Sequence, residues 1–413
     1  MDGGTPPGHI LARVVPCVLI QPFCISRFPR IVFGAGTVEK LPAIAAEFGR
    51  RALLVTGASS FQRSPRWDAL RQGLQRAGID LEHTTVSGEP SPGLVDDVVK
   101  RFREKQPTVV IAIGGGSVLD AGKAIAGLLC TGDSVMEYLE GVGPEKPYEG
   151  PAVPFIAAPT TAGTGSEATR NAVLSVQGEH GFKKSFRDER LVPEYAIVDP
   201  DLLASCPPAQ IAANGMDALT QLMESCVSTR ASRMTDALAL DGIQAVRDSL
   251  LALYENPGSA SAARSGMAYA ALLSGITLAQ TGLGSVHGLA SPLGAFFPIP
   301  HGVVCGTLVA AATRENITAM LGREPANPAL GKYRQLAELL CGREFSAPEE
   351  AYDALVQRLQ DWVRRLEIPR LGQFGVRKSD FARIVANSRG SSMKTNPIVL
   401  SDGEISAILV QRL

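Results

Sequence analysis

Paired cysteines, long apolar runs and an excess of charge of one sign are all missing from this sequence. The seven cysteines lie scattered, at positions 17, 24, 130, 206, 226, 305 and 341, with no Cys-x-x-Cys pair. An odd, scattered set argues against a disulfide framework or a structural zinc knuckle, and it favours a cytoplasmic protein. Lysine and arginine number 40 against 41 aspartates and glutamates, so no overall field would attract nucleic acid. We therefore expect no nucleic-acid partner.

No segment has the length of a membrane span. The apolar stretch near the start, residues 9–20, is interrupted by Arg13 and Pro16 and has no charged lead-in. It is too short to cross a bilayer. We predict a peripheral strand there behind a loose tail, within an N-terminal tail and edge segment of residues 1–27, and we expect no membrane partner.

The sequence does contain enough apolar chain for more than one folded core. It has 413 residues, 45% of them hydrophobic, whereas single cores stop growing near roughly 250–300 residues. Up to about residue 206, short apolar runs alternate with helical patterns. Strands are predicted at 30–33, 52–56, 108–113, 155–158 and 195–198, and helices at 38–48, 65–77 and 118–129. Apolar strands separated by helices indicate a parallel sheet with both faces covered.

The pattern changes after Cys206. Apolar residues then recur at helical spacing, as at Ile243, Val246 and Leu250, and strand-like runs almost disappear. The predicted fold class is α/β plus all-α, with an α/β domain at 28–206 and an all-helical domain at 207–413. The helical half is expected to form the second wall of a cleft.

Three consecutive glycines, Gly114–Gly116, follow the strand predicted at 108–113 and lead through Ser117 into a helix. Glycine permits positive φ and lets the backbone approach a ligand closely, and the helix offers free amides and its positive dipole end to a phosphate. A tight strand–helix turn is an equally good interpretation of the glycines alone. Asp120 and Lys123, three residues apart, would by themselves make a surface pair.

A second polar cluster favours the binding interpretation. Residues 159–166, Pro-Thr-Thr-Ala-Gly-Thr-Gly-Ser, follow another predicted strand and place three threonines and a serine in one loop. Such a loop offers hydroxyls and amides to a sugar or a phosphate. The alternative is a solvated turn, but a turn seldom needs so many small hydroxyl residues directly after a buried strand.

Several ordered motifs resemble the iron-containing (group III) alcohol dehydrogenases. They are Gly-Gly-Gly-Ser-x-x-Asp-x-x-Lys at 114–123, Pro-Thr-Thr-x-Gly-Thr-Gly-Ser-Glu at 159–167, Val-Asp-Pro at 198–200, Asn-Gly-Met-Asp-Ala-Leu at 214–219, His-Gly-x-x-x-Pro-Leu-Gly at 287–294 and Pro-His-Gly at 300–302. The resemblance runs from about Phe28 to the end of the chain. It implies a Rossmann-like nucleotide-binding domain, a helical-bundle domain carrying a divalent metal, and hydride transfer in the cleft between them.

The resemblance also implies roles for individual residues. Gly115, Gly116 and Ser117 would hold the pyrophosphate of the cofactor, and Thr160, Thr161 and Thr164 would line its adenosine and ribose side. Asp120 would lie near the nicotinamide as a candidate catalytic residue. Lys183 matches, by a looser alignment, a lysine that reaches a cofactor ribose.

The metal site is expected in the helical half. Asp217 and Gln221 are four residues apart on a predicted helix, and His287 and His301 are two of only five histidines. The family site is one aspartate and three histidines: Asp-x-x-x-His, then two histidines fourteen residues apart. Asp217, His287 and His301 match this pattern, and the two histidines are candidate catalytic residues through the metal, Fe²⁺ or Zn²⁺.

Two positions depart from the family pattern. Gln221 stands where histidine is usual, and an amide oxygen is a poorer ligand for these metals. Three outcomes stay open: Gln221 ligates weakly, water completes a site of Asp217, His287 and His301, or the site holds no metal. Ser291 replaces a further histidine that the family uses as a proton relay, and serine cannot hold a proton near neutral pH.

The predicted function is therefore an NAD(P)-dependent oxidoreductase that interconverts an alcohol and an aldehyde or ketone. No carboxylate follows the strand at 52–56 before Asp68, whereas Gly57, Ser59, Ser60 and Arg63 could accommodate a 2′-phosphate, so NADP is expected to be tolerated beside NAD. Alternatives are a maleylacetate-type reductase, a lyase like dehydroquinate synthase, whose architecture is similar, and a non-catalytic nucleotide-binding paralogue. The expected partners are a small alcohol or carbonyl substrate and further copies of the chain, in a homodimer or larger homo-oligomer.

Overall fold

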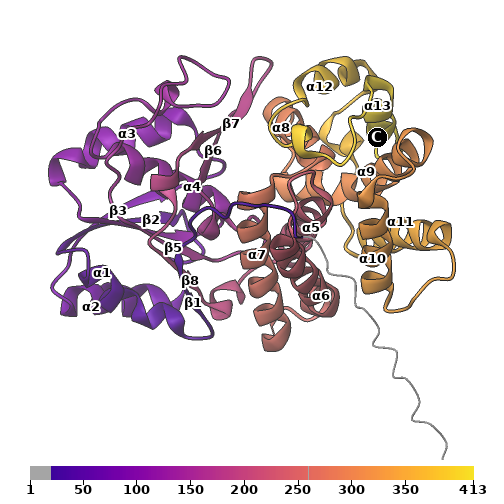
Figure 1. Cartoon of the computed structure of the whole chain (residues 1–413). Helices are drawn as coiled ribbons and strands as arrows, with labels where there is room; N and C mark the ends of the chain where they lie inside the picture. Colours follow the sequence, from indigo (N-terminus) through magenta and orange to yellow (C-terminus); the bar gives the residue numbers. More distant parts are fainter. Residues whose placement is uncertain (1–19, 259) are drawn as a thin grey trace, which may run out of the picture.

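The computed structural model describes residues 20–258 and 260–413, and the peripheral strand expected over 9–20 falls almost entirely outside these ranges. A layered α/β half and a helical half lie side by side (Figure 1). Within the described residues, no helix is both long enough and apolar enough to cross a membrane.

The α/β half is built on a six-stranded parallel sheet in the order β1-β8-β5-β4-β2-β3. Its strands are β1 (Arg30–Phe33), β2 (Arg51–Gly57), β3 (Asp80–Val86), β4 (Val109–Gly114), β5 (Phe155–Pro159) and β8 (Tyr195–Val198). Five of these were predicted from their apolar runs, and the parallel sheet is confirmed. The sequence did not predict β3, a polar edge strand in which only Val86 is buried.

Helices cover both faces of this sheet, as the continuous apolar strands indicated. The α/β helices are α1 (Leu41–Ala46), α2 (Pro65–Arg76), α3 (Pro92–Phe102) and α4 (Gly116–Leu128). Figure 1 shows α1 and α2 on one face and α3 and α4 on the other. Alternate side chains of β2 therefore enter different cores: Leu53 packs toward α3 and α4, whereas Leu54 packs toward α1 and α2.

A separate antiparallel hairpin, β6 (Asn171–Val176) and β7 (Phe182–Arg187), projects between the two halves. The sequence did not predict its strands. The strand β7 carries the polar run Phe-Lys-Lys-Ser-Phe-Arg, without the continuous apolar pattern of the central strands, whereas the short apolar run in β6, Ala-Val-Leu, was missed. The hairpin contacts α4 on one side and α8 on the other, so it bridges the two halves beside the cleft described below.

The helical half begins with α5 at Pro208, ten residues after the last strand ends at Val198. Its helices are α5 (Pro208–Val227), α6 (Arg233–Glu255), α7 (Ser261–Thr281), α8 (Ser285–Phe296), α9 (His301–Arg323), α10 (Pro328–Cys341), α11 (Pro348–Arg365), α12 (Phe381–Asn387) and α13 (Asp402–Gln411). The buried face of α6 includes Ile243, Val246 and Leu250, as their spacing predicted. Helix α5 lies centrally, against α6, α7 and α9.

Candidate functional site

The glycine-rich and threonine-rich loops meet at the carboxyl ends of β4 and β5. Gly114 pairs with Pro159 in the sheet register, and the Thr160 amide donates to the Gly114 carbonyl at 2.9 Å. A Cβ on Gly116 would lie 2.7 Å from Thr164 Oγ1, so the two loops touch with no room for a side chain between them. They therefore form one continuous surface at the N-terminus of α4.

Backbone conformation does not explain why Gly114–Gly116 are glycines. None of the three has positive φ, and Gly115 has a φ of −73° as the N-cap of α4. A Cβ on Gly114 would lie 2.5 Å from Val118, and one on Gly116 would strike Thr164. Close approach of side chains thus excludes larger residues here, and the first amides of α4 are left free of intrahelical partners.

The threonine-rich loop is buried, so the alternative of a solvated turn is wrong. Ser166 and Glu167 are 4% and 2% exposed. Gly165 has a φ of +59°, and a Cβ there would lie 2.4 Å from the Gly275 backbone in α7. The loop is therefore fixed between the sheet and the helical half, where it can line a cleft shared by both.

Asp120 and Lys123 belong to a buried network, which makes the surface-pair interpretation wrong. The Lys123 side chain is fully buried, and its Nζ donates to the Ser166 carbonyl at 2.8 Å and to Thr169 Oγ1 at 2.9 Å. Asp120 Oδ1 lies 3.4 Å from that Nζ and accepts from Ser166 Oγ at 2.5 Å. Burial raises the pKa of Asp120 and lowers that of Lys123. The pair ties α4 to the threonine-rich loop.

A cavity of about 520 Å³ runs from this surface into the helical half. Nine of the residues singled out individually from the sequence line it: Gly116, Ser117, Asp120, Thr164, Lys183, Gln221, His287, Ser291 and His301. Gly115, Thr160, Thr161 and Asp217 are not among the lining residues. A single cleft therefore joins the predicted cofactor loops to the predicted metal ligands.

The hairpin closes one side of this cleft. Lys183 on β7 forms an ion pair with Glu89, with its Nζ 2.6 and 2.7 Å from the two carboxylate oxygens. Ser291 Oγ on α8 donates to the Lys183 carbonyl at 2.9 Å. Ser291, which stands at the position of the family's relay histidine, thus holds α8 against the hairpin.

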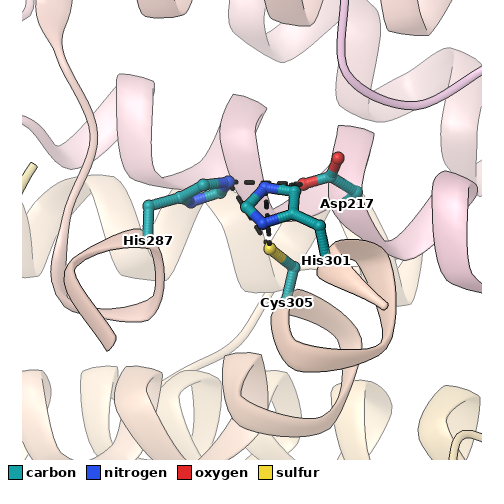
Figure 2. A group of neighbouring side chains, drawn as sticks. All are labelled: Asp217, His287, His301 and Cys305. Carbon is teal, nitrogen blue, oxygen red and sulfur yellow. Dashed lines mark hydrogen bonds and ion pairs between the residues drawn. The ribbon is translucent and has the colours of Figure 1, made fainter. Parts of the chain in front are cut away.

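Four side chains converge at the inner end of the cleft (Figure 2). One potential ligand atom from each of Asp217, His287, His301 and Cys305 lies within 4.8 Å of the other three. Asp217 Oδ1 is 3.3 Å from His287 Nε2 and 3.7 Å from His301 Nε2. Helices α5, α8 and α9 contribute these side chains, so the cluster depends on the packing of the helical half.

Gln221 also faces the cleft, one turn beyond Asp217 on α5. Its Oε1 accepts a hydrogen bond from Ser274 Oγ on α7 at 2.7 Å. This hydrogen bond uses one of the two lone pairs of the amide oxygen, the only atom of the side chain that could ligate a metal.

Sequence reasoning missed two members of the site, Cys305 and Glu224. Cys305 stands four residues after His301 on α9, the spacing that places two side chains on one helix face. Glu224 lies one turn beyond Gln221, and its Oε2 is 2.7 Å from His287 Nδ1. It also accepts from the Gly284 and Val286 amides, at 2.9 and 2.7 Å. It therefore fixes the ring so that Nε2 points at the cluster.

The electrostatics of the cluster favour a positive charge. Burial lowers the pKa of His301 to about 4, so this imidazole is neutral and keeps a lone pair for a ligand. Burial opposes protonation of His287 as well, but Cys305, Asp217 and Glu224 outweigh it and raise its pKa well above the usual range. Burial also raises the pKa of the Cys305 thiol, to about 12. Two buried carboxylates beside one imidazole thus suit a cation.

Two family models together span most of the chain. The model described as iron-containing alcohol dehydrogenase matches residues 29–200, and the model described as Fe-containing alcohol dehydrogenase family, C-terminal, matches residues 211–413. The two matched regions correspond to the sheet-bearing half and the helical half.

Individual relatives match over nearly their full length. Alcohol dehydrogenase 4 of Saccharomyces cerevisiae (strain ATCC 204508 / S288c) is 34% identical over 387 residues, which are 92% of this chain and 96% of that protein. The 1,3-propanediol dehydrogenase of Klebsiella pneumoniae is 33% identical, with 88% and 91% covered. A crystal structure of 1,3-propanediol oxidoreductase superposes with a TM-score of 0.85 at 29% identity, covering 95% of this chain and 100% of that one. The chain thus belongs to the iron-containing alcohol dehydrogenase family and is an NAD(P)-dependent oxidoreductase that interconverts alcohols and carbonyl compounds.

Proposed function

We propose that the cleft holds NAD(P)H across the two loops and an alcohol or carbonyl substrate at its inner end. The pyrophosphate lies over Gly115, Gly116 and Ser117, at the amino end of α4, where free amides and the helix dipole favour an anion. The adenosine and ribose side faces Thr160, Thr161 and Thr164. The observation that carries this proposal is the continuity of one cleft from α4 to the paired histidines.

Asp120 and Lys183 complete the proposed cofactor site. Asp120 lines the cleft one turn into α4, on the way from Ser117 to His287, which suits a position near the nicotinamide. Lys183 faces the cleft from the opposite wall, where its ammonium is oriented by Glu89 and can reach a ribose hydroxyl. Asp120 itself accepts from Ser166, so its carboxylate positions the loop as well as the cofactor.

The cluster fits a divalent cation held by Asp217, His287 and His301. The ligand atoms converge within 4.8 Å, and the buried carboxylates of Asp217 and Glu224 lack any lysine or arginine partner among the ion pairs of the described residues. When bound, such a cation supplies Lewis acidity to the substrate oxygen, and the nicotinamide supplies or accepts the hydride. His287 and His301, on the cleft wall, direct the reacting oxygen toward Asp120 and the cofactor loops.

We expect water in the cleft, and not Ser291, to exchange the proton with the substrate. Ser291 already donates its hydroxyl hydrogen to the Lys183 carbonyl, so it can offer only an acceptor. The Gln221 side chain keeps its amide hydrogens for the cleft, because its oxygen accepts from Ser274. It can therefore donate to the substrate oxygen and orient it.

For the cofactor, we propose that NADP is accepted beside NAD. Ser59, Ser60 and Arg63 are exposed after β2, and Gln62 holds this loop by donating to the Gly57 carbonyl at 3.0 Å. An arginine and two hydroxyls suit a 2′-phosphate, and no carboxylate occupies the loop. Comparison of kcat/KM for the two cofactors checks this, and a strong preference for NADH would contradict it.

We further propose a division of the chain at residues 206/207, a cytoplasmic location and a homodimer or larger homo-oligomer. The strand β1 is an edge of the sheet and carries exposed apolar side chains, including Ile31 and Phe33, with Phe28 just before it. Among the described residues no strand pairs with the outer side of β1, and apolar side chains on such an edge favour contact with a second chain. Sedimentation of the purified protein checks the oligomer.

The principal test measures metal content and turnover in the same preparations. Protein purified without chelator is analysed for bound metal and assayed with a panel of alcohols, aldehydes and ketones, by the change in NAD(P)H absorbance. His287→Ala and His301→Ala should each lower metal content and turnover, whereas His180→Ala, at an exposed histidine, should change neither. Full turnover in metal-free protein would exclude the Lewis-acid role, and cofactor binding with no net absorbance change on any substrate would favour a lyase or a non-catalytic protein.

A further inference from the structure

We propose that Cys305 supplies a thiolate ligand to this cation in place of the family histidine at position 221, and that the site consequently prefers zinc to iron. The inference rests on the proposed function, since it takes Asp217, His287 and His301 as the other ligands. It adds a fourth donor of different chemistry and releases Gln221 from ligation.

The distances within the cluster match the edges of a tetrahedral zinc site. With zinc bonds of about 2.0–2.1 Å to nitrogen or oxygen and about 2.3 Å to sulfur, tetrahedral angles put ligand atoms about 3.3 Å apart, or about 3.6 Å where one is sulfur. Cys305 Sγ lies 3.5 Å from His287 Nε2 and 3.8 Å from His301 Nε2. Asp217 Oδ1 lies 3.3 Å from His287 Nε2 and 3.7 Å from His301 Nε2. Four of the six distances between ligand atoms are thus close to those of one tetrahedral cation, and all six are within 4.8 Å.

The other three members of the cluster surround the thiol. Cys305 is fully buried, and its Sγ contacts the two imidazole nitrogens and the Asp217 carboxylate. A thiol is a weak donor, so two imidazoles and a carboxylate facing it are better satisfied by a shared cation than by one S–H. Cation binding would displace the thiol proton to solvent and leave the sulfur as thiolate.

Gln221 is the poorer candidate for this position. Its Oε1 shares its lone pairs with Ser274, and an amide oxygen is a harder and weaker ligand than imidazole or thiolate. The donor missing from α5 at position 221 is thereby replaced by one from the facing helix α9. His301 and Cys305 then form a His-x-x-x-Cys pair one turn apart, equivalent in spacing to the family's Asp-x-x-x-His on α5.

The arrangement leaves a face open for substrate. His287 and His301 line the cleft, whereas Asp217 and Cys305 are 1% and 0% exposed and lie behind them. The sulfur is therefore shielded from solvent, and a cation held here would be reached by a substrate oxygen from the histidine side. Sulfur ligation favours zinc over iron(II) because thiolate is the softer donor and zinc the better acceptor for it.

The test reads out the ligand directly, without turnover. Zinc K-edge X-ray absorption of the zinc-loaded protein should show one sulfur at about 2.3 Å beside nitrogen and oxygen. The cobalt(II)-loaded protein should show a thiolate-to-cobalt charge-transfer band in the near ultraviolet. Cys305→Ser should abolish both signals and weaken zinc binding by more than about 100-fold, because loss of a ligand should exceed the effect of losing an outer partner.

Two matched variants separate ligation from packing. Cys226→Ser alters another buried cysteine on α5, outside the cluster, and should leave the sulfur shell and the zinc affinity unchanged. Gln221→Ala should keep the charge-transfer band. A zinc site with only nitrogen and oxygen neighbours in the wild-type protein, or a band that survives Cys305→Ser, would overturn the inference while leaving the proposed function intact. A protein that binds no metal under any condition would refute the metal-dependent function itself.

Discussion

Replacing Lys123 with methionine should destabilise the protein more than almost any other single charge removal. Its ammonium is fully buried and has a partner for each of its three hydrogens: the Ser166 carbonyl at 2.8 Å, Thr169 Oγ1 at 2.9 Å and the Asn171 carbonyl at 2.5 Å. Methionine keeps the length and most of the volume of the lysine side chain. The substitution therefore removes the charge and its hydrogen bonds with little change in packing.

The expected cost follows from what is left behind. Removing one partner of a buried ion pair typically costs about 3–5 kcal/mol, because the other charge stays buried without compensation. Here that charge is Asp120, 3.4 Å away, and the Ser166 and Asn171 carbonyls lose a partner as well. We expect Lys123→Met to lower the free energy of unfolding by about 3–5 kcal/mol. Adding Asp120→Asn should restore part of it, because the unpaired carboxylate disappears.

Urea unfolding of the cofactor-free protein, followed by circular dichroism, measures this difference. Lys146→Met, at an exposed lysine paired with Glu137, is the control and should unfold as the wild-type protein does. A Lys123→Met protein within about 0.5 kcal/mol of wild type would refute the reasoning. So would a double variant with Asp120→Asn that is less stable than Lys123→Met alone.

Three further substitutions test separate parts of the site. Glu224→Gln should weaken metal binding by about 10- to 100-fold in chelator competition. Glutamine has one acceptor oxygen, so it cannot accept from the Val286 amide at one end and from His287 and the Gly284 amide at the other, as the carboxylate does. Unchanged affinity would contradict this. Gly116→Ala should lower the free energy of unfolding in urea by about 1–3 kcal/mol, because the new methyl group would collide with Thr164. Adding Thr164→Ala should restore much of this loss. A double variant with no restored stability would mean that the loops are not in contact as described. Burial raises the pKa of Glu167 from 4.5 to about 7. The free energy of unfolding of the wild-type protein, relative to Glu167→Gln, should therefore be highest below pH 4.5 and fall by at most about 3 kcal/mol as the pH rises through 7. A difference that does not change with pH would refute this.

The central strands were predictable because they are buried on both faces. Their residues form uninterrupted apolar runs, as in β4, whose six residues are all buried. The strands β3 and β7 could not be found this way, since they lie at a sheet edge and in a small hairpin, where one side faces solvent or the cleft. Their apolar pattern is correspondingly weak.

Only part of the candidate site could be predicted from the sequence. Spacing along one helix could link Asp217 to Gln221, but the contact of His287 with Glu224 joins side chains 63 positions apart and depends on how α5 packs against α8. Cys305 was counted as one of several scattered cysteines, although its distance of four residues from His301 was the signal that could have placed it at the cluster. The need for Gly116 likewise arises from contact with Thr164, which only the fold creates.

The backbone contact between Gly165 and Gly275 has a mechanical consequence. Because no side chain separates the loop from α7 at this point, the two segments cannot slide past each other without a collision of main-chain atoms. A rigid rotation that opened the cleft would have this contact as its fulcrum. Because Lys123 also ties the same loop to α4, the loop would stay with the sheet while the helical half turned about it, and the hydrogen bond from Ser291 to the Lys183 carbonyl would have to break for α8 to leave the hairpin.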